Sequence, residues 1–590
     1  MVREFSANVK DIKAVLRTEG KSYEIPRYQR GYSWKNSQVS SFWNDLIEEE
    51  YGLFIGTILM NQGDKLGQRV EIIDGQQRLL TITILFSSIR DALEKIGGGG
   101  AYRAVQAIQE RYIEHEEGFD EEKEVKILVS KSIRNYFENL IVSYPRNEED
   151  IEPTTDEEKR VRATKKFFDS NIKKSLKSID GDGDKIAWLK GLADRVGRLK
   201  VVAIDVSDQE DAYTVFESVN AKGAQLTLAD ILKSLIFRRV PETAEEDRAQ
   251  RQWDKMIANL DGTGFTISKF IRYYWLSKFG FLTETKLYSA IKDKLEREGT
   301  MTWEELLDEL VSNSRNLRVL KDAEYDSFYD YNSTRQVTNA LKGISLMNVS
   351  QVYVLLMSMH RNMSMKKKWE REFKALEDFS FNYHTVGKGQ AVRVEKKYSE
   401  WAQQIENLNK IEDKEKRSGE LEEILKRALS NLQELRDQYV PEVVFIPGFI
   451  QELDYSKARQ RPLIAYVLKR IDDHYSGGTG EYVINPHKVN LEHVLPQKPE
   501  QWNLDSSDVE EYVNEIGNLT ILSKKLNSEA GNKPLKEKIT ILEKSEITIT
   551  QSLVRSINEE GVVWNEDSIH NRSMELAKTS YDEIWNLGSR

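Results

Sequence analysis

The stretch VEIIDGQQRLLTITILFSSIRDALEKI, residues 70–96, decides the fold of the N-terminal part of the chain. Residues 70–73 are mostly β-branched, which predicts a short buried strand. The apolar side chains that follow recur at steps of three and four and so share one face of a helix: Leu79, Ile82, Phe86, Ile89 and Leu93. Further strand patterns occur at residues 54–60 and 199–206. We therefore predict an N-terminal α/β unit with a small mixed sheet.

The turn between this strand and helix carries residues that suit a phosphate group. Asp74 stands where a helix N-cap is expected, and Gly75 lets another backbone or a ligand come close. Gln76, Gln77 and Arg78 fall in the first helical turn, where N–H groups are unpaired and the helix dipole is positive. This pattern predicts a phosphate site with Arg78 as a bidentate ligand. The alternative is that Asp74 only caps the helix and Arg78 only forms a surface ion pair.

A second polar stretch, YEIPRYQRGYSW at residues 23–34, mixes basic and aromatic side chains. Pro26 favours an extended backbone before it. Arg27, Gln29 and Arg30 then lie among aromatic residues, an arrangement that could hold a phosphate and stack a base or a sugar. The alternative is an aromatic loop packed on the core.

Residues 212–237 predict a helix, a glycine-containing turn and a second helix that is capped by Thr227. Asn220 could close over a nucleotide. Asp230 and Lys233 could equally belong to a structural polar network, so the sequence leaves both interpretations open.

Composition and charge limit the classes of protein to which this chain can belong. The chain has 590 residues, of which 39% are hydrophobic and 31% charged, as in helix-rich globular proteins of several domains. Cysteine is absent, which excludes disulfides and cysteine-ligated zinc. The N-terminus lacks a signal-peptide core and no apolar run reaches the length of a membrane span, so we expect a cytoplasmic protein that does not bind membranes.

A net charge of −11 argues against indiscriminate coating of DNA, although local basic patches could still bind it. Candidate patches are residues 365–369, 393–397 and 457–461, and each could instead be a solvated helix face. The region 241–440 is helical in pattern and carries no chemistry of its own. His384, in the loop-like sequence FNYHTVGKGQ, is predicted to be a surface residue.

The second chemical centre begins with VNLEHVLPQ, residues 489–497. Among the histidines that directly follow an acidic residue, only His493, after Glu492, ends an apolar strand. The asparagines Asn518 and Asn527 follow. A carboxylate and an amide oxygen can hold a hard divalent cation, while a neutral imidazole with a pKa near the working pH takes a proton from water. This constellation indicates metal-assisted phosphodiester hydrolysis, and the alternative is a satisfied structural histidine.

The motifs at both ends of the chain resemble those of one family of bacterial defence enzymes. IDGQQRLLT at residues 73–81, preceded by a P-x-x-Q-R-x-Y-x-W segment, is similar to the ParB-like, nucleotide-responsive N-terminal domain of the GmrSD restriction enzymes. LEHVLPQ at residues 491–497, followed by GNLT at 517–520, looks like the HNH nuclease motif of their GmrD part. In HNH enzymes generally, such motifs make His493 the base and Glu492 and Asn527 the metal ligands, while Asn518 orders the loop.

The resemblance implies an α+β, predominantly helical fold in three parts. Residues 1–240 would form a GmrS-like, ParB-like α/β nucleotide-binding domain, with 241–440 as a helical spacer or DNA- or partner-binding region. Residues 441–590 would form a GmrD-like HNH nuclease domain with a ββα-metal unit. The chain departs from many HNH enzymes in having glutamate where they have aspartate and in lacking the cysteine zinc knuckle.

The resemblance also implies an activity, that of fused, BrxU-like type IV modification-dependent restriction endonucleases. The expected substrate is double-stranded phage DNA with hydroxymethylated or glucosylated cytosine. The expected cofactors are Mg²⁺ or Mn²⁺ and a nucleoside triphosphate (ATP, GTP or UTP), which the enzyme could hydrolyse. The chain could form a homodimer. Two alternatives stay open: a related nuclease or NTPase that senses another mark, such as phosphorothioate DNA, and a nucleotide-dependent sensor with a vestigial nuclease.

Overall fold

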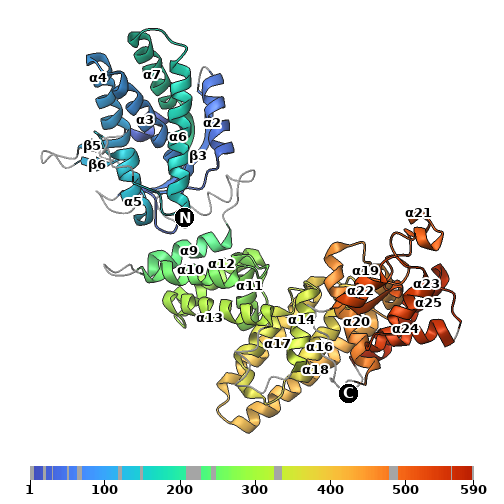
Figure 1. Ribbon diagram of the computed structural model, residues 1–590. Helices are drawn as coiled ribbons and strands as arrows, with labels where there is room; N and C mark the ends of the chain where they lie inside the picture. Colours follow the sequence, from blue (N-terminus) through green and yellow to red (C-terminus); the bar gives the residue numbers. More distant parts are fainter. Residues whose placement is uncertain are drawn as a thin grey trace. The chain divides into compact units, whose positions relative to one another are not determined.

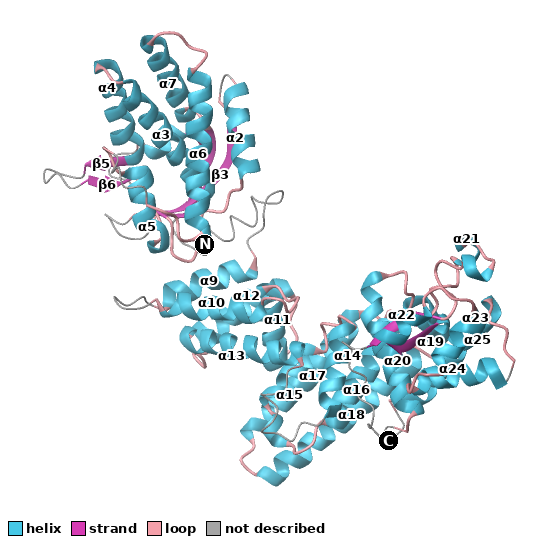
Figure 2. Ribbon diagram, in the orientation of Figure 1, coloured by secondary structure: helices cyan, strands magenta, loops and turns pink. Residues whose placement is uncertain are grey.

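The computed structural model describes residues 5–17, 22–29, 31–49, 52–62, 69–116, 123–145, 151–206, 227–240, 247–323, 335–477, 489–559 and 561–587. The fold is α+β and predominantly helical, as predicted (Figure 2). The chain forms two compact units, Met1–Gln250 and Arg251–Arg590 (Figure 1). The domain boundaries expected near residues 240 and 440 stay predictions.

The N-terminal unit contains a mixed sheet with the strand order β1-β8-β3-β4-β2-β7. Its pairs are antiparallel between β1 and β8 and between β3 and β4, and parallel elsewhere. The strands are β1 (Phe5–Asp11), β2 (Tyr23–Glu24), β3 (Phe54–Asn61), β4 (Val70–Asp74), β7 (Ile127–Leu128) and β8 (Lys200–Val206). A separate small hairpin pairs β5 (Glu114–Glu116) with β6 (Lys123–Val125). The small mixed sheet predicted from the sequence is confirmed.

The helix α3 (Gln76–Ile96) packs against α4, α6 and α7 (Figure 1). The other helices are α1 (Ile12–Leu16), α2 (Asn36–Glu48), α4 (Gly99–Ile108), α5 (Lys131–Phe137), α6 (Asp156–Leu176), α7 (Asp182–Gly197) and α9 (Leu228–Arg239). α10 (Arg248–Leu260) runs across the boundary between the units. Thr227 caps α9, as predicted, and the Asp230 carboxylate accepts hydrogen bonds from it in return.

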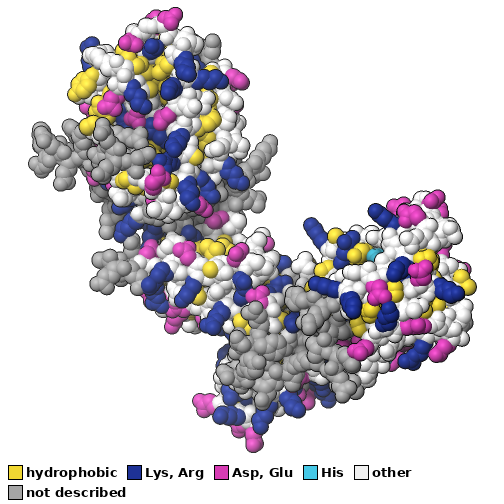
Figure 3. Space-filling view, viewed as in Figure 1, with side chains coloured by type: hydrophobic (Ala, Val, Ile, Leu, Met, Phe, Trp, Pro, Cys, Tyr) yellow, Lys and Arg dark blue, Asp and Glu magenta, His cyan; other side chains and the backbone are white. Residues whose placement is uncertain are grey.

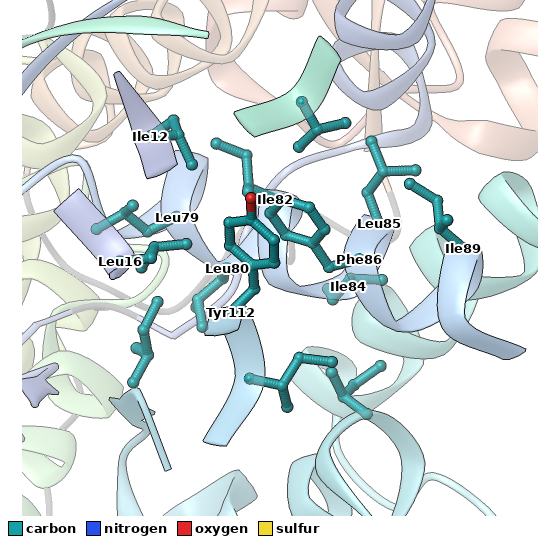
Figure 4. Packing of buried hydrophobic residues seen from close by; sticks show 14 of the residues in the cluster. Ile12, Leu16, Leu79, Leu80, Ile82, Ile84, Leu85, Phe86, Ile89 and Tyr112 are labelled. Atoms are coloured by element: carbon teal, nitrogen blue, oxygen red, sulfur yellow. The ribbon is translucent and has the colours of Figure 1, made fainter. Parts of the chain in front are cut away.

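The sequence predicted one apolar face for α3, but the helix is buried on nearly all sides. Phe86 stacks on Tyr112 from the neighbouring segment, with ring centroids 4.0 Å apart (Figure 4). Polar side chains on the other faces are paired inside the core: Arg90 donates to Asp91 Oδ1 at 2.8 Å, and Lys165 Nζ lies 2.8 Å from Asp91 Oδ2. Pairing lets the helix bury charged residues that would otherwise cost several kcal/mol each.

The second unit is a helical assembly that carries a two-stranded sheet of β9 (Val489–His493) and β10 (Leu519–Ser523). Its first helices are α11 (Ile267–Lys278), α12 (Glu284–Lys292), α13 (Trp303–Asp322), α14 (Arg335–Leu346), α15 (Tyr353–Arg361), α16 (Glu370–Phe379), α17 (Ala391–Asn407) and α18 (Lys414–Tyr439). Then follow α19 (Glu442–Glu452), α20 (Arg461–Tyr475), α21 (Ser506–Val509), α22 (Lys524–Ala530), α23 (Leu535–Leu542), α24 (Thr548–Glu559) and α25 (Glu566–Thr579). The helical middle predicted from the sequence is thus present.

His384, predicted to be a surface residue, is partly buried. His384 belongs to a buried π-helical turn, Ser380–Val386, and packs edge-on against Phe379 and Tyr383. The loop that follows folds back onto this turn, since a Cβ on Gly389 would come within 2.2 Å of the Tyr383 ring. The polar and glycine-rich sequence resembled a surface loop, but aromatic packing buries it.

Acidic, basic and hydrophobic side chains are interspersed on the face of the molecule drawn in Figure 3. Among the described residues, no helix is both long enough and apolar enough to cross a membrane.

Burial of His384 predicts a pH-dependent stability. Burial lowers the pKa of His384 and of His360 to about 4, against about 6.5 for an ordinary imidazole. The folded protein holds these rings neutral, whereas the unfolded chain takes up protons below pH 6.5. The stabilisation is therefore complete above pH 6.5 and falls as the pH drops towards 4, on the order of 3 kcal/mol for each ring. Urea unfolding between pH 7 and pH 4 measures this loss.

The variant His384→Leu should show a shallower loss of stability over this pH range than the wild type. His570→Leu is the matched control, because the His570 side chain is 51% exposed. Identical pH slopes for His384→Leu and wild type would contradict the assignment.

Candidate nucleotide site and candidate active site

The strand-to-helix turn predicted to bind a phosphate lies where the sequence placed it, with one correction. β4 ends at Asp74 and α3 begins at Gln76, but Gly75, not Asp74, is the N-cap residue. Asp74 still pairs with Leu59 of β3, so it lies one residue too early to cap. Gly75 has φ +94°, and a Cβ there would come within 3.0 Å of the Ile58 side chain. Only glycine combines this conformation with so close an approach to β3.

Arg78 is held by Asp74, as the alternative interpretation of the sequence expected. Arg78 Nη2 lies 3.2 Å from Asp74 Oδ2, and the two side chains are 25% and 32% exposed. Arg78 Nη1 also reaches the Ile55 carbonyl at 3.4 Å. The guanidinium lies directly over Gly56, where a Cβ would be 2.6 Å from Nη1. The missing side chain at Gly56 therefore makes room for Arg78, a contribution that sequence reasoning missed.

The three glutamines predicted at this site form hydrogen bonds between the segment 29–33 and the start of α3. Gln76 Nε2 donates to Gln29 Oε1 at 3.1 Å, and Gln29 Nε2 donates to the Ile73 carbonyl at 2.9 Å. Gln77 bonds through both amide atoms to the backbone of residues 31–33, at 2.8 and 3.1 Å. The glutamines thus fasten the segment after Gln29 to the start of α3. Of the three, Gln77 has both amide atoms bonded to the backbone, so its contacts are those of a structural residue.

The remaining residues of the N-terminal motif have structural contacts. Arg27 binds the end of α9: it donates to the carbonyls of Phe237 and Val240, and its Nη1 lies 2.9 Å from Asp247 Oδ2. Tyr32 is buried, and its hydroxyl bonds to Thr81 Oγ1 at 2.8 Å, as the packed-loop alternative expected. Arg30 and Asn220, both predicted to bind the nucleotide, lie outside the described residues.

In the second unit, β9 and β10 form an antiparallel pair in which His493 lies opposite Leu519, and α22 follows directly. This is the predicted ββα arrangement. Asn527, on α22, donates through Nδ2 to Glu492 Oε2 at 2.6 Å and to the Leu491 carbonyl at 3.2 Å. The helix thereby brings Asn527 to Glu492.

Glu492 is almost fully buried, at 7% exposure, and is paired on both oxygens. Lys538 Nζ lies 2.7 Å from Oε1, and the Lys538 side chain is 1% exposed. The ammonium also donates to the carbonyls of His493 and Val494. Burial raises the pKa of Glu492, and Lys538 and Asn527 oppose that rise.

His493 stays neutral over a wider pH range than the sequence predicted. Burial, with the charges of Lys538 and Arg461, lowers its pKa to about 4, while a hydrogen bond with the Asn514 side chain acts the other way. The expected pKa near the working pH is therefore wrong. Its Nε2 atom is buried and has no hydrogen-bond partner within the described residues. The neutral ring can accept a proton at this nitrogen, but with a pKa of about 4 it is a weaker base at pH 7 than an ordinary imidazole.

Asn518, placed among the catalytic residues, orders the loop after β9. Its Oδ1 accepts from the Leu495 amide at 2.8 Å and from Trp564 Nε1 at 3.1 Å. Its Nδ2 donates to the carbonyls of Leu495 and Val513, both at 2.8 Å. These bonds fix the backbone that leads away from His493, so Asn518 is a positioning residue.

Sequence reasoning gave Lys538 no role. A signal was present: Lys538 lies three and four positions before the buried Ile541 and Leu542 of α23, which places it on the buried face of that helix. A lysine at such a position is expected to pair with a buried acid.

The residue types present, a carboxylate and an amide, include the oxygen donors that a divalent cation prefers. In this structure the Glu492 oxygens accept from Lys538 Nζ at 2.7 Å and from Asn527 Nδ2 at 2.6 Å, so a cation would have to replace the contact with the Asn527 amide nitrogen. Among the described residues, no group of three or more His, Asp or Glu side chains could hold a metal ion. Two protein ligands would leave the other positions to water and phosphate oxygens.

Comparison with known families agrees with this geometry. Residues 12–237 match the model described as "GmrSD restriction endonuclease, N-terminal domain", and residues 441–579 match "GmrSD restriction endonucleases, C-terminal domain". No curated protein matches the chain. The two matched domains define a restriction endonuclease, an enzyme of phage defence whose substrate is DNA. The chain belongs to the GmrSD family and is a fused GmrSD-type type IV restriction enzyme, with both parts in one polypeptide.

Proposed function

We propose that this restriction endonuclease is regulated by a nucleotide, depends on a divalent metal, and cuts DNA that carries hydroxymethylated or glucosylated cytosine. One observation supports metal-dependent cleavage: Asn527 of α22 and Lys538 of α23 both contact Glu492, which directly precedes His493 in β9. The choice of modified cytosine follows from the family to which the chain is similar.

Each residue of this site has its own role in the proposed cleavage reaction. His493 takes the proton from the attacking water at its open Nε2 nitrogen. Lys538 and Asn518 hold the backbone at and after His493 through the carbonyls of His493 and Leu495. Glu492 and Asn527 would hold the Mg²⁺ or Mn²⁺ ion. When bound, such an ion stabilises negative charge at phosphorus and on the leaving oxygen.

The nucleotide would bind at the start of α3. Asp74, Gly75, Gln76 and Arg78 lie at the positive end of this helix, and Gln29 is bonded to them through Gln76 and the backbone of the preceding strand. Arg78 is already engaged with Asp74, so a phosphate would compete with that carboxylate for the guanidinium. Gln77 would support the site through the loop that it holds.

Arg78→Ala tests the nucleotide site. Loss of a charge-assisted contact should weaken ATP, GTP or UTP binding by about 1.5–3 kcal/mol, measured by calorimetry. Arg198→Ala is the matched control, because Arg198 forms a comparable ion pair with Asp194 at 2.6 Å on an exposed helix surface of the same unit. Equal affinity for wild type and Arg78→Ala would place the nucleotide elsewhere.

Digestion of defined DNAs tests the whole proposal. Unmodified, hydroxymethylated, glucosylated and phosphorothioate DNA are each incubated with the enzyme and Mg²⁺, with and without each nucleotide. The proposal expects cutting of hydroxymethylated or glucosylated DNA that responds to a nucleotide. Cutting of phosphorothioate DNA alone would assign another mark, and binding without any cutting would favour a sensor with a vestigial nuclease.

A further inference from the structure

The segment that joins α19 to α20 lies against the candidate general base. Tyr455 of this segment meets the His493 ring edge-on, with ring centroids 4.5 Å apart and planes at 86°. The Tyr455 amide donates to the Asn514 carbonyl at 3.0 Å, and the Asn514 side chain bonds to His493. Tyr455 is therefore fixed both through its backbone and through its ring.

Arg461 lies on Tyr455. Its guanidinium carbon is 4.2 Å from the centre of the Tyr455 ring, and its Nε donates to the Tyr455 carbonyl at 3.0 Å. The side chain is exposed, and no carboxylate pairs with it within the part of the chain that the structure describes. A stacked arginine, unpaired among the described residues, thus lies one aromatic ring away from the candidate base.

Other arginines of this unit are used differently. Arg272 and Arg361 are mostly buried, and each pairs with a glutamate, at 2.6 and 2.9 Å. The basic patch at residues 365–369 is also partly neutralised, since Lys366 pairs with Glu372 and Glu422. The patch at residues 457–461 differs because Arg461 has no acidic partner among the described residues, and exposed Lys457 and Arg459 precede it.

We propose that Arg461, held on the face of Tyr455, binds a backbone phosphate of the DNA next to the bond on which His493 acts. This inference rests on the nuclease activity of the unit. The planar guanidinium offers two terminal nitrogens in a fork that matches a phosphate, and the ring beneath it limits the directions the fork can take. A contact to phosphate positions DNA without reading its sequence or its modification.

DNA binding at several salt concentrations tests the proposal. The full-length wild type, Arg461→Met and Arg461→Lys are compared in EDTA, so that cleavage does not interfere, with short unmodified and hydroxymethylated duplexes as probes. Arg461→Met should weaken binding roughly tenfold for both duplexes and lower the slope of log affinity against log salt by about 1. Arg461→Lys should keep most of the salt slope, because the positive charge remains. It should lose part of the affinity for DNA, because lysine lacks the two-nitrogen fork of the guanidinium.

Arg427→Met is the matched control, since Arg427 is also exposed and its Nε also donates to a backbone carbonyl, that of Glu423, at 3.3 Å. This variant should bind both duplexes as the wild type does. Tyr455→Phe should keep binding, and Tyr455→Leu should resemble Arg461→Met, because the ring and not the hydroxyl supports the guanidinium.

An unchanged salt slope in Arg461→Met would overturn the proposal. So would a loss confined to the hydroxymethylated duplex, which would assign Arg461 to recognition of the modified base. These binding readouts do not depend on cutting, so they separate a wrong role for Arg461 from a failure of the proposed cleavage specificity.

Discussion

His493→Ala is expected to abolish DNA cleavage while leaving the fold and nucleotide binding intact. The imidazole acts only in the chemical step, and loss of a general base typically slows a reaction by about 100- to 10,000-fold. The His493 ring is not part of the hydrophobic core cluster of this unit, and it packs edge-on against Tyr455 in the segment before α20. The measurement is the rate of cutting of modified DNA under single-turnover conditions, with circular dichroism to verify the fold.

A metal titration of Asn527→Ala provides the comparison. Asn527 is expected to act through metal affinity, so higher Mg²⁺ or Mn²⁺ should partly restore cutting in this variant and not in His493→Ala. Glu492→Ala should behave like Asn527→Ala, with a further loss of stability because Lys538 is then buried without its partner. EDTA should stop cutting by the wild type. Restoration of His493→Ala by metal alone would show that another residue is the base.

Lys538→Met is expected to destabilise the nuclease unit strongly. The substitution leaves Glu492, at 7% exposure, as a buried carboxylate without its cation. Breaking a buried ion pair on one side typically costs about 3–5 kcal/mol. The carbonyls of His493 and Val494 also lose their donor, so the backbone that positions the base becomes less well fixed. Urea unfolding at pH 7 measures the loss of stability, and the cutting rate reports the effect on the site.

Lys544→Met is the matched control, because Lys544 pairs with Glu529 at 2.6 Å in a pair whose side chains are 52% and 37% exposed. An exposed pair is worth about 0–1 kcal/mol, so this variant should unfold nearly as the wild type does. The double variant Glu492→Gln with Lys538→Met should recover much of the lost stability, since no charge is then left buried. A similar small loss for Lys538→Met and Lys544→Met would contradict the buried-pair account.

The sequence was most informative where chemistry and periodicity coincide along a short stretch. The strand at Val70, the turn at Gly75 and the helix from Gln76 follow from β-branched residues, a glycine and steps of three and four. The helix cap was predicted one residue too early, because the pairing of Asp74 with β3 depends on a strand that is distant in the sequence.

The sequence was least informative about burial. The polar turn around His384 reads as a surface loop, yet it is covered by aromatic rings and by Trp585 near the C-terminus, which stacks on Phe381 at 4.2 Å. Trp585 lies some two hundred positions away in the chain, so no local sequence pattern predicts that it buries this turn.

The sequence by itself determined the class of fold, the order of the two chemical centres and the residue types at each, because these depend on local spacing and on the chemistry of single side chains. Only the tertiary structure decided which partner each charged group has. Arg78 pairs with Asp74, Arg27 with the end of α9, and Lys538 with Glu492. Partner choice is a matter of distances between segments that folding brings together, and Coulomb energy and burial change steeply over those few ångströms.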